Sequence, residues 1–323
     1  MSPRDRLLAG TRWSWPQLLL WALVLALPAL LPAHALILNE IAIVALFALS
    51  LDLVLGYTGI VSLGHAAFLG FGAYSAALFA KHLHPDPLLG LLVGTLAATL
   101  LGALASLTIL RGSDLTRLMV TLGLALILME LANKFTDLTG GADGLQGVLM
   151  GPLLGRFEFD LMGQVAAWYS LAVLSVALVL ARRWVQSPWG AGLMAVRDNP
   201  LRAAAIGISV PRQLASVYTV GAALAGAAGS LLAQTSGFAS LDVFALERSA
   251  DAVLMIVIGG AGWLWGGVIG AVVFKILHDV IAGITPQYWT FWMGLFLVVL
   301  MLVGRDRLNA PWQRWRRRKE GAA

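Results

Sequence analysis

Ser62 and His65 are the residues of this chain whose types and spacing come nearest to a catalytic pair. A histidine can act as a general base and activate a nearby serine hydroxyl for nucleophilic attack. The sequence offers no evident third group to orient the histidine, and the surrounding glycines already have a packing explanation. The chain has no cysteine, and His65 has no second histidine at ligand spacing, which argues against a metal site. We therefore predict that His65 is a hydrogen-bonded packing residue, and an intramembrane enzyme is the least favoured alternative.

Several ionisable residues lie inside long apolar runs, where proton or ion chemistry could take place: Asp52, Glu130, Lys134, Lys275 and Asp279. A charged side chain near the centre of a bilayer costs roughly 2.5–3.5 kcal/mol on insertion scales, so each should face protein or water. Glu130 and Lys134 stand four residues apart, as do Lys275 and Asp279, and each pair can neutralise itself on one helix. Structural pairing is therefore favoured. The alternative is a secondary transporter that works alone and couples to an ion through Asp52 or Glu130.

Arginines gather in a polar insert, residues 182–212, between two apolar runs. The insert contains only one acidic residue, Asp198. Its arginines are Arg182, Arg183, Arg197, Arg202 and Arg212. Basic loops of membrane proteins stay on the cytoplasmic side. The insert is therefore predicted to lie in the cytoplasm.

Two cap-and-proline signals divide the insert into short helices. Ser187-Pro188 and Asn199-Pro200 each place a capping residue before a proline at the first helical position. The second helix should run over 200–206 and stop at Gly207, with a bend between the helices near Arg197 and Asp198. Double caps are uncommon in an ordinary connection, so we favour a docking element over a plain loop.

Two glycine-rich motifs are candidates for a solute path. Residues 56–59 (GYTG) and 62–65 (SLGH) follow one apolar run and open the next. Glycines there could break a helix near the midplane and expose polar helix ends to a solute, or could simply allow tight helix packing. Residues 138–144 (LTGGADG) could be a turn or could shape an external mouth. The path candidates are Tyr57, Thr58, Ser62, Gly64, His65, Thr139, Gly140, Gly141 and Asp143.

The composition predicts which kind of secondary structure must position these residues. The chain has 323 residues, of which 59% are hydrophobic and only 12% charged. A soluble domain carries about 25% charged residues, so this chain has too few charges for a water-facing surface. Recurring apolar runs predict one all-α, polytopic membrane helical bundle. The expected segments are 17–34, 36–55, 62–80, 88–110, 116–135, 163–181, 213–234, 249–261, 264–283 and 288–304. Of these, 62–80 and 249–261 are short or glycine-rich, and each either spans fully or is a half-helix or re-entrant segment.

Charge distribution predicts the orientation of the bundle. Basic residues cluster at both ends and in the insert, whereas acids outnumber Arg156 in loop 136–162. Both termini should therefore be cytoplasmic and that loop external. We divide the chain into a cytoplasmic N-terminus (1–16), a transmembrane domain (17–308) and a basic cytoplasmic tail (309–323).

The arrangement around the insert favours a repeat. About five segments lie on each side of it, which suggests a five-plus-five inverted repeat of the kind transporters use. At the N-terminus, the apolar run and Ala33-His34-Ala35 also fit a cleavable signal peptide, although an uncleaved first helix is favoured.

The motifs together resemble the LivM-type permease subunits of branched-chain amino acid ABC importers. The resemblance covers about residues 36–308, in order and with family-like spacing. The matching stretches are GYTGIVSLGHAAFLGFGAY (56–74), LTGGADGLQG (138–147), GAGLMAVRDNPLRAAAIGI (190–208), AALAGAAGSLLA (222–233), MIVIGGAGWLWGGVIGA (255–271) and WTFWMGLFLVVLMLVGRDRL (289–308).

The resemblance implies the partners of the chain. Such a permease pairs with a second, homologous permease in the bacterial inner membrane, binds two ATPase subunits and receives substrate from an extracytoplasmic binding protein. The chain itself has no G-x-x-x-x-G-K-[ST] motif, so ATP and Mg²⁺ should bind only in the partner subunits. We expect no catalytic activity, cofactor, metal or nucleic acid in this chain.

The resemblance also implies that residues 190–208 seat in a groove of the ATPase. A common Glu-Ala-Ala start is absent here, where Arg202 precedes the alanines, so a contact specific for an acid is not expected. The family's urea- and amide-importing branch shares most motifs and is the alternative for the substrate. The residues selected for coupling are Ser187, Gly190, Ala195, Val196, Arg197, Asp198, Asn199, Ala204 and Gly207.

Overall fold

The computed structural model describes residues 24–303 except 110, 111, 113 and 161. Both predicted termini, 1–16 and 309–323, lie outside these residues. The chain divides into two compact units, residues 1–271 and 272–323. Helices make up the described part, which contains isolated β-bridges but no strand, so the all-α prediction is confirmed.

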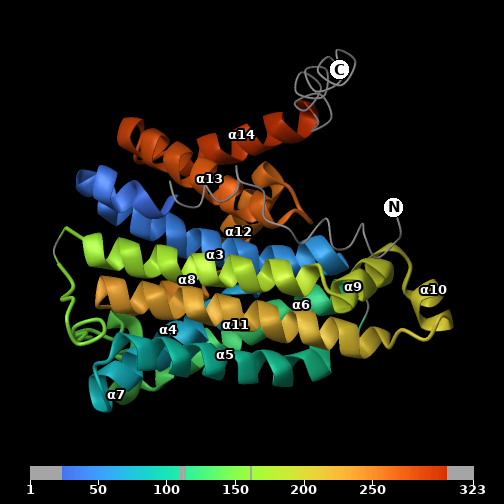
Figure 1. Cartoon of the computed structure of the whole chain (residues 1–323), viewed down its shortest axis with the longest axis horizontal. Helices are drawn as coiled ribbons and strands as arrows, with labels where there is room; N and C mark the ends of the chain where they lie inside the picture. The colour runs from blue at the N-terminus through green and yellow to red at the C-terminus, as the bar shows by residue number, and fades with distance from the viewer. Residues whose placement is uncertain (1–23, 110–111, 113, 161, 304–323) are drawn as a thin grey trace. The chain divides into compact units, whose positions relative to one another are not determined.

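Within the described residues, six helices are long and apolar enough to cross a membrane. Figure 1 labels the helices along the chain. The six are the 3-10 turn η1 (Pro32–His34) together with α3 (Ala35–Thr58), then α5 (Pro87–Ile109), α6 (Asp114–Lys134), α8 (Gln164–Val185), α11 (Val210–Ser236) and α13 (Leu264–Ile284). The shorter elements are α4 (Ala66–His82), α7 (Thr136–Thr139), η2 (Gly141–Asp143), α9 (Pro188–Asp198), α10 (Pro200–Ala205), η3 (Leu241–Phe244), α12 (Leu246–Gly259) and α14 (Trp289–Val303).

The shorter helices agree with two expectations from the sequence. α4 has 17 residues and α12 has 14, so α12 extends about 21 Å against a hydrocarbon core of about 30 Å. Both segments were singled out as short or re-entrant. The first predicted segment, 17–34, begins outside the described residues, and within it residues 24–30 are helical. The five-plus-five repeat stays a prediction.

Small residues hold the core of the first unit together. α11 packs against α3, α4 and α5, and a Cβ on Gly229 of α11 would lie 1.8 Å from the carbonyl oxygen of Leu69. A Cβ on Gly94 of α5 would lie 2.1 Å from Ser230 Oγ. The backbones can approach this closely only because no side chain intervenes. Gly94 therefore forms a helix-packing face.

Glycines also allow the backbones to pack closely at the turn between α12 and α13. A Cβ on Gly270 would meet the Met255 carbonyl oxygen at 1.8 Å, and one on Gly266 would meet the Gly260 carbonyl oxygen at 2.2 Å. The Gly266-x-x-x-Gly270 spacing thus brings the start of α13 against α12.

The predicted intrahelical ion pairs have different outcomes. In the second unit, Lys275 Nζ lies 3.0 Å from Asp279 Oδ1, so that pair is confirmed. In the first unit, Glu130 and Lys134 are exposed on α6, and no ion pair between them is found among the described residues. The expectation that these two side chains pair with each other is therefore wrong, whereas their exposure agrees with the expectation that each faces protein or water. Both stand in the last turns of α6, where long side chains reach toward the interface.

Candidate functional site

The insert folds as the two predicted short helices, α9 and α10. Ser187 Oγ accepts from the Gly190 N–H at 3.5 Å, and Asn199 Oδ1 accepts from the Arg202 N–H at 2.9 Å. Each proline follows its cap at the first helical position, where its missing N–H is no loss. The bend falls at Asn199, whose backbone is extended, one residue later than the predicted Arg197-Asp198 position.

α10 ends one residue earlier than predicted, at Ala205, in a Schellman motif. The Ile208 N–H donates to the Ala203 carbonyl and the Gly207 N–H to the Ala204 carbonyl, each at 3.0 Å. Gly207 has a φ of +90°, which a glycine adopts without strain. The predicted role of Gly207 as a helix stop is therefore confirmed.

The two helices bury one face and present the other. Gly190, Leu193 and Val196 of α9 and Ala203 of α10 are buried. On the opposite side, Leu201 is 83% and Ile206 70% exposed. Among the remaining coupling candidates, Asp198, Asn199, Ala204 and Gly207 are exposed, whereas Ser187 and Ala195 are half-buried.

α9 is attached to the start of α11. Trp189 Nε1 donates to Ser216 Oγ at 2.7 Å, and a Cβ on Gly192 would lie 2.6 Å from Gln213 Nε2. α9 also contacts α3 and α8. The insert is thus a fixed part of the first unit, and a displacement of α9 acts on α3, α8 and α11.

Arg197 points from α9 onto the end of α3. Its Nη1 donates to the carbonyl oxygen of Gly56 at 2.5 Å, while the pair that it forms with Asp198 is longer, 3.9 Å between Nε and Oδ1. Gly56 lies in the last turn of α3, where carbonyls lack intrahelical partners and the helix dipole favours a cation. The candidate coupling residue therefore contacts its own chain.

Asp52 of α3 lies inside the bundle, close to the contact between Arg197 and Gly56. The residue is fully buried, and its Oδ1 accepts from the Gly262 N–H at 2.9 Å. Gly262 belongs to the turn between α12 and α13 and has a φ of +76°. Asp52 thus holds this turn against α3.

The helix breaks after α3, as the glycines predicted. Residues 59–65 are not helical, and Gly59 caps α3 with a φ of +75°. His65, at the start of α4, contacts Ser50, about two turns before α3 ends. α4 therefore begins well inside the bundle. The Ala66 N–H at this buried start donates to Ser249 Oγ of α12 at 2.9 Å.

Tight packing accompanies the break, so the helix break and the packing interpretation of the glycine motif are confirmed. A Cβ on Gly64 would lie 1.7 Å from the Thr121 carbonyl oxygen of α6. A solute path through this region stays a prediction.

His65 is a buried packing residue, as predicted. Its Nε2 lies 3.0 Å from Ser50 Oγ, and its ring stacks on Phe47 with 5.7 Å between centroids. Ser62 is also fully buried, and its Oγ lies 3.4 Å from the Tyr218 hydroxyl rather than next to the histidine. Ser62 and His65 thus have different partners, which removes the basis for a Ser62–His65 enzyme.

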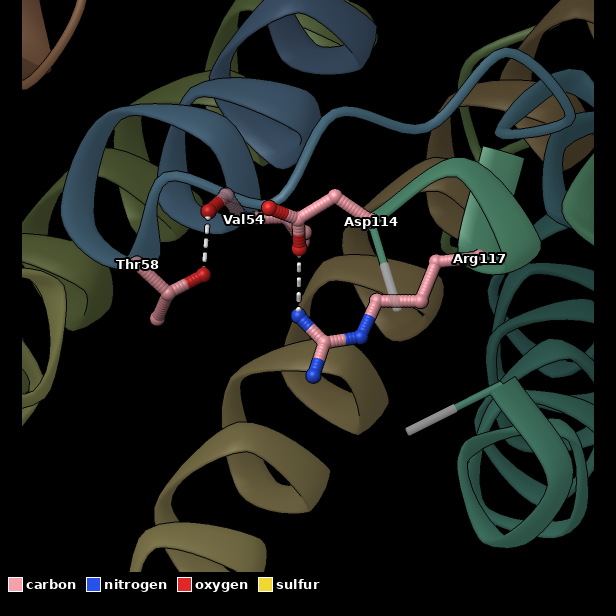
Figure 2. Close-up of polar contacts among 4 residues, drawn as sticks. All are labelled: Val54, Thr58, Asp114 and Arg117. Carbon is pink, nitrogen blue, oxygen red and sulfur yellow. Dashed lines mark hydrogen bonds and ion pairs between the residues drawn. The ribbon is translucent and has the colours of Figure 1, made fainter. Parts of the chain in front are cut away.

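Tyr57 and Thr58 complete the path candidates at this end of the bundle. Both are buried. Figure 2 shows the Thr58 hydroxyl donating to the Val54 carbonyl of its own helix, at 2.6 Å, and the ion pair between Arg117 and Asp114 at the start of α6. The Thr58 hydroxyl is therefore occupied within α3.

The second group of path candidates lies at the other end, in the loop 136–151. Thr139 is buried, and its hydroxyl donates to the carbonyls of Ala132 and Phe135. A Cβ on Gly140 would lie 2.1 Å from the Gly144 carbonyl oxygen, so a tight turn requires this glycine. Gly141 is buried and Asp143 is exposed. Figure 1 places α7 and α9 at opposite ends of the bundle, so the two groups of candidates do not form one cluster.

This loop is anchored to the far ends of α11 and α4. Leu145 and Ala239 exchange two backbone hydrogen bonds, of 2.8 and 3.1 Å. Leu145, Val148, Tyr74 and Phe244 share one apolar cluster, in which the rings of the last two stack. Lys81 Nζ donates to the Gln146 carbonyl at 3.2 Å. These contacts hold the glycine-rich loop in place over this end of the bundle.

Asp160 lies just before α8, the helix that leads from this loop to the insert, and its carboxylate accepts from the first turn of that helix. Burial opposes ionisation of Asp160, but the N–H groups of Val165 and Gln164 donate to its carboxylate at 3.0 and 3.2 Å. Together with further backbone N–H groups, they hold the pKa of Asp160 below its ordinary value.

Sequence reasoning missed several residues of this site. Gly262, Ser249 and Tyr218 meet Asp52, Ala66 and Ser62 respectively, across long stretches of chain. The sequence identifies Asp52 as a charge that is costly to bury and therefore needs a partner. It does not indicate which residue that partner is.

Comparisons with known proteins agree on one family. A family described as the permease component of branched-chain amino acid transport systems matches residues 34–304. The high-affinity branched-chain amino acid permease protein LivM of Escherichia coli (strain K12) is 28% identical over 301 residues, covering 86% of this chain and 70% of its own length. The corresponding LivM of Salmonella typhimurium is 29% identical over 296 residues, with 83% and 68% covered.

A sugar permease is also similar. The fructose import permease protein FrcC of Rhizobium meliloti is 25% identical over 278 residues, with 83% of this chain and 76% of its own length covered. No solved structure matches the chain significantly.

Proposed function

The chain belongs to the family of permease components of branched-chain amino acid transport systems, and from this premise we propose that it is the membrane subunit of an ATP-driven importer. It is a transporter subunit and not a catalytic enzyme. In the proposed complex it forms the translocation path with a second, homologous permease. Two ATPase subunits bind ATP and Mg²⁺, and an extracytoplasmic protein delivers the substrate.

Support for the coupling role comes from α9 and α10. The segment 187–208 buries one face on the bundle and leaves exposed Leu201 of α10 and Ile206, the residue that follows this short helix. Isolated apolar side chains of this kind, at the end of a basic segment, fit a groove in a partner protein. Because α9 contacts α3, α8 and α11, a pull on this segment reaches three helices that are long enough to span the membrane.

The orientation follows from the charges. The arginine-rich insert is proposed to face the cytoplasm, and the loop 136–151 to face the outside of the inner membrane, with both termini cytoplasmic. The external loop is then available to the binding protein, while α10 is available to the ATPases.

Branched-chain amino acids are the proposed substrates, because the two LivM relatives carry this specificity in their names. Fructose is the second candidate, because FrcC matches a similar share of the chain at 25% identity. Urea and short amides are the third, since importers of these solutes share most of the motifs.

The decisive experiment reconstitutes the chain in proteoliposomes with its partner permease, ATPases and binding protein. Uptake of labelled leucine, valine, fructose and urea is then measured with and without ATP. We expect ATP-dependent uptake of the amino acids. Uptake of fructose or urea instead would reassign the substrate.

The chain alone, without its partners, supplies the control. We expect no uptake from it under a proton or sodium gradient. Gradient-driven uptake by the chain alone would contradict the importer and support an ion-coupled secondary transporter.

A further inference from the structure

The contacts of Arg197 assign it a role other than binding the ATPase. Its guanidinium donates to the Gly56 carbonyl, and a Cβ on Gly262 would lie only 3.1 Å from its Nη1 and 3.0 Å from the Gly56 oxygen. One side chain of the insert therefore lies against both the end of α3 and the turn between α12 and α13.

Asp52 completes this junction from the other side. It stands one turn before Gly56 on α3, and its carboxylate accepts from the Gly262 N–H. A Cβ on Gly56 would lie 2.3 Å from Gly262 N and 2.4 Å from Asp52 Oδ1. The α12–α13 turn is thus pressed onto one face of α3, with Asp52 on one side and Arg197 on the other.

The chemistry of the two bonds suits a mechanical connection. Both involve a charged group and a backbone group at a helix end or turn, where no intrahelical partner competes. Such charge-assisted bonds are roughly twice as strong as neutral ones. Backbone partners also transmit a displacement directly, because they cannot move by a change of rotamer.

We propose that Arg197 is a positioning residue that ties the coupling segment to the end of α3 and to the α12–α13 turn, and that Asp52 holds this turn in place. Movement of α9 then carries the turn and the start of α13 with it. This inference rests on the proposed function, because it concerns how a displacement by the ATPases reaches the membrane helices.

The first test is a double-mutant cycle of Arg197→Ala and Asp52→Ala in the complete importer complex. Arg197→Ala should leave the amount of co-purified ATPase unchanged while about tenfold more ATP is hydrolysed per substrate imported, the factor expected from one charge-assisted bond. Arg197→Lys should restore part of the coupling. The double variant should be hardly worse than Arg197→Ala, because both changes break one junction.

Arg183→Ala is the matched control, since Arg183 is an exposed arginine in the last turn of α8. It should keep normal coupling. Loss of the ATPase from the Arg197→Ala complex would place Arg197 in the docking contact and overturn the proposal. Fully additive effects of the two changes would overturn it as well.

A second test needs neither substrate nor a change at Asp52. The chain has no cysteine, so spin labels can be attached to Met194→Cys of α9 and Ala261→Cys of the turn, both exposed positions. The distance distribution should be narrow with Arg197 present and broad in Arg197→Ala, and no change would contradict the tether. Failure of the wild-type complex to import amino acids would contradict the proposed function alone.

Discussion

At the scale of single residues, glycines decide how closely the helices of the first unit approach. Gly64 and Gly123 illustrate the contrast. A Cβ on Gly64 would lie 1.7 Å from the Thr121 carbonyl oxygen, whereas nothing lies within 4 Å of a Cβ on Gly123. The same substitution should therefore have opposite outcomes at the two positions.

Gly64→Ala should destabilise the protein, because the backbone of α6 has to move to admit the methyl group. Overpacking of this kind costs about 1–3 kcal/mol, which corresponds to a loss of several degrees in apparent Tm. Thermal unfolding of the purified protein in detergent measures the effect. Gly123→Ala is the control and should leave Tm unchanged or slightly higher, since alanine favours the helix. Equal Tm values for the two variants would contradict the packing at Gly64.

Asp160 gives a pH-dependent prediction. Because its folded pKa lies below the ordinary value, the ionised carboxylate stabilises the folded state above the unfolded pKa of about 3.9, and this stabilisation is lost as pH falls through the folded pKa. Asp160→Ala should cost about 1 kcal/mol at pH 7, where the cap on α8 is lost.

The measurement is thermal unfolding between pH 7 and pH 3. The difference between wild type and Asp160→Ala should shrink as pH falls below about 4. Asp143→Ala, at an exposed aspartate of the same stretch between α6 and α8, should show little difference at either pH. A gap for Asp160→Ala that persists unchanged at pH 3 would argue against the carboxylate as the source of stability.

At the scale of elements, local signals were readable from the sequence. The caps Ser187 and Asn199 and the stop Gly207 predicted α9 and α10 to within one residue, because capping depends on neighbours in the chain. The break after α3 was equally local, since Gly59 adopts a positive φ. These elements follow from residue types within a few positions of each other.

The junction at Asp52 could not be predicted in the same way. Asp52 and Gly262 are 210 positions apart, and Arg197 and Gly56 are 141 apart. No periodicity or cap links such residues, because their contact arises from the packing of whole helices. Glu130 and Lys134 failed for a related reason: their spacing allowed a pair, but both side chains are exposed near the end of α6. The two groups of path candidates are likewise both rich in glycine, but they lie at opposite ends of the bundle (Figure 1).

The exposed apolar residues of α10 lead to a prediction for this element. Leu201→Ser combined with Ile206→Ser should remove the ATPase from the purified complex, weakening its binding at least about tenfold. The permease itself should fold normally, because both side chains are exposed. Co-purification followed by quantification of each subunit measures the effect.

Leu149→Ser is the matched control for α10. Leu149 is 81% exposed in the loop 136–151, at the end of the bundle away from α10, and its change should leave the ATPase bound. Normal ATPase content in the Leu201→Ser, Ile206→Ser variant would show that the contact lies elsewhere on the insert.

At the scale of the whole molecule, burial is uneven among the membrane-spanning helices. In the most apolar stretch of η1 and α3, 83% of the residues are buried within the chain. In the corresponding stretch of α6, only 17% are buried. An apolar helix with so little cover within its own chain requires lipid or another subunit around it. The first unit is therefore built around α3, α4 and α11, and its outer helices are the surfaces on which the membrane and the second permease would lie.

The orientation of the bundle can be tested with single cysteines, because the chain has none of its own. Leu201→Cys and Leu149→Cys replace exposed side chains at the two ends of the first unit. In intact cells, a membrane-impermeant maleimide should label Leu149→Cys and spare Leu201→Cys. In inverted membrane vesicles, the labelling should be reversed, because the arginine-rich insert is proposed to lie in the cytoplasm. Labelling of Leu201→Cys in intact cells would place the insert outside, where ATPases have no access, and coupling through α9 and α10 could not operate.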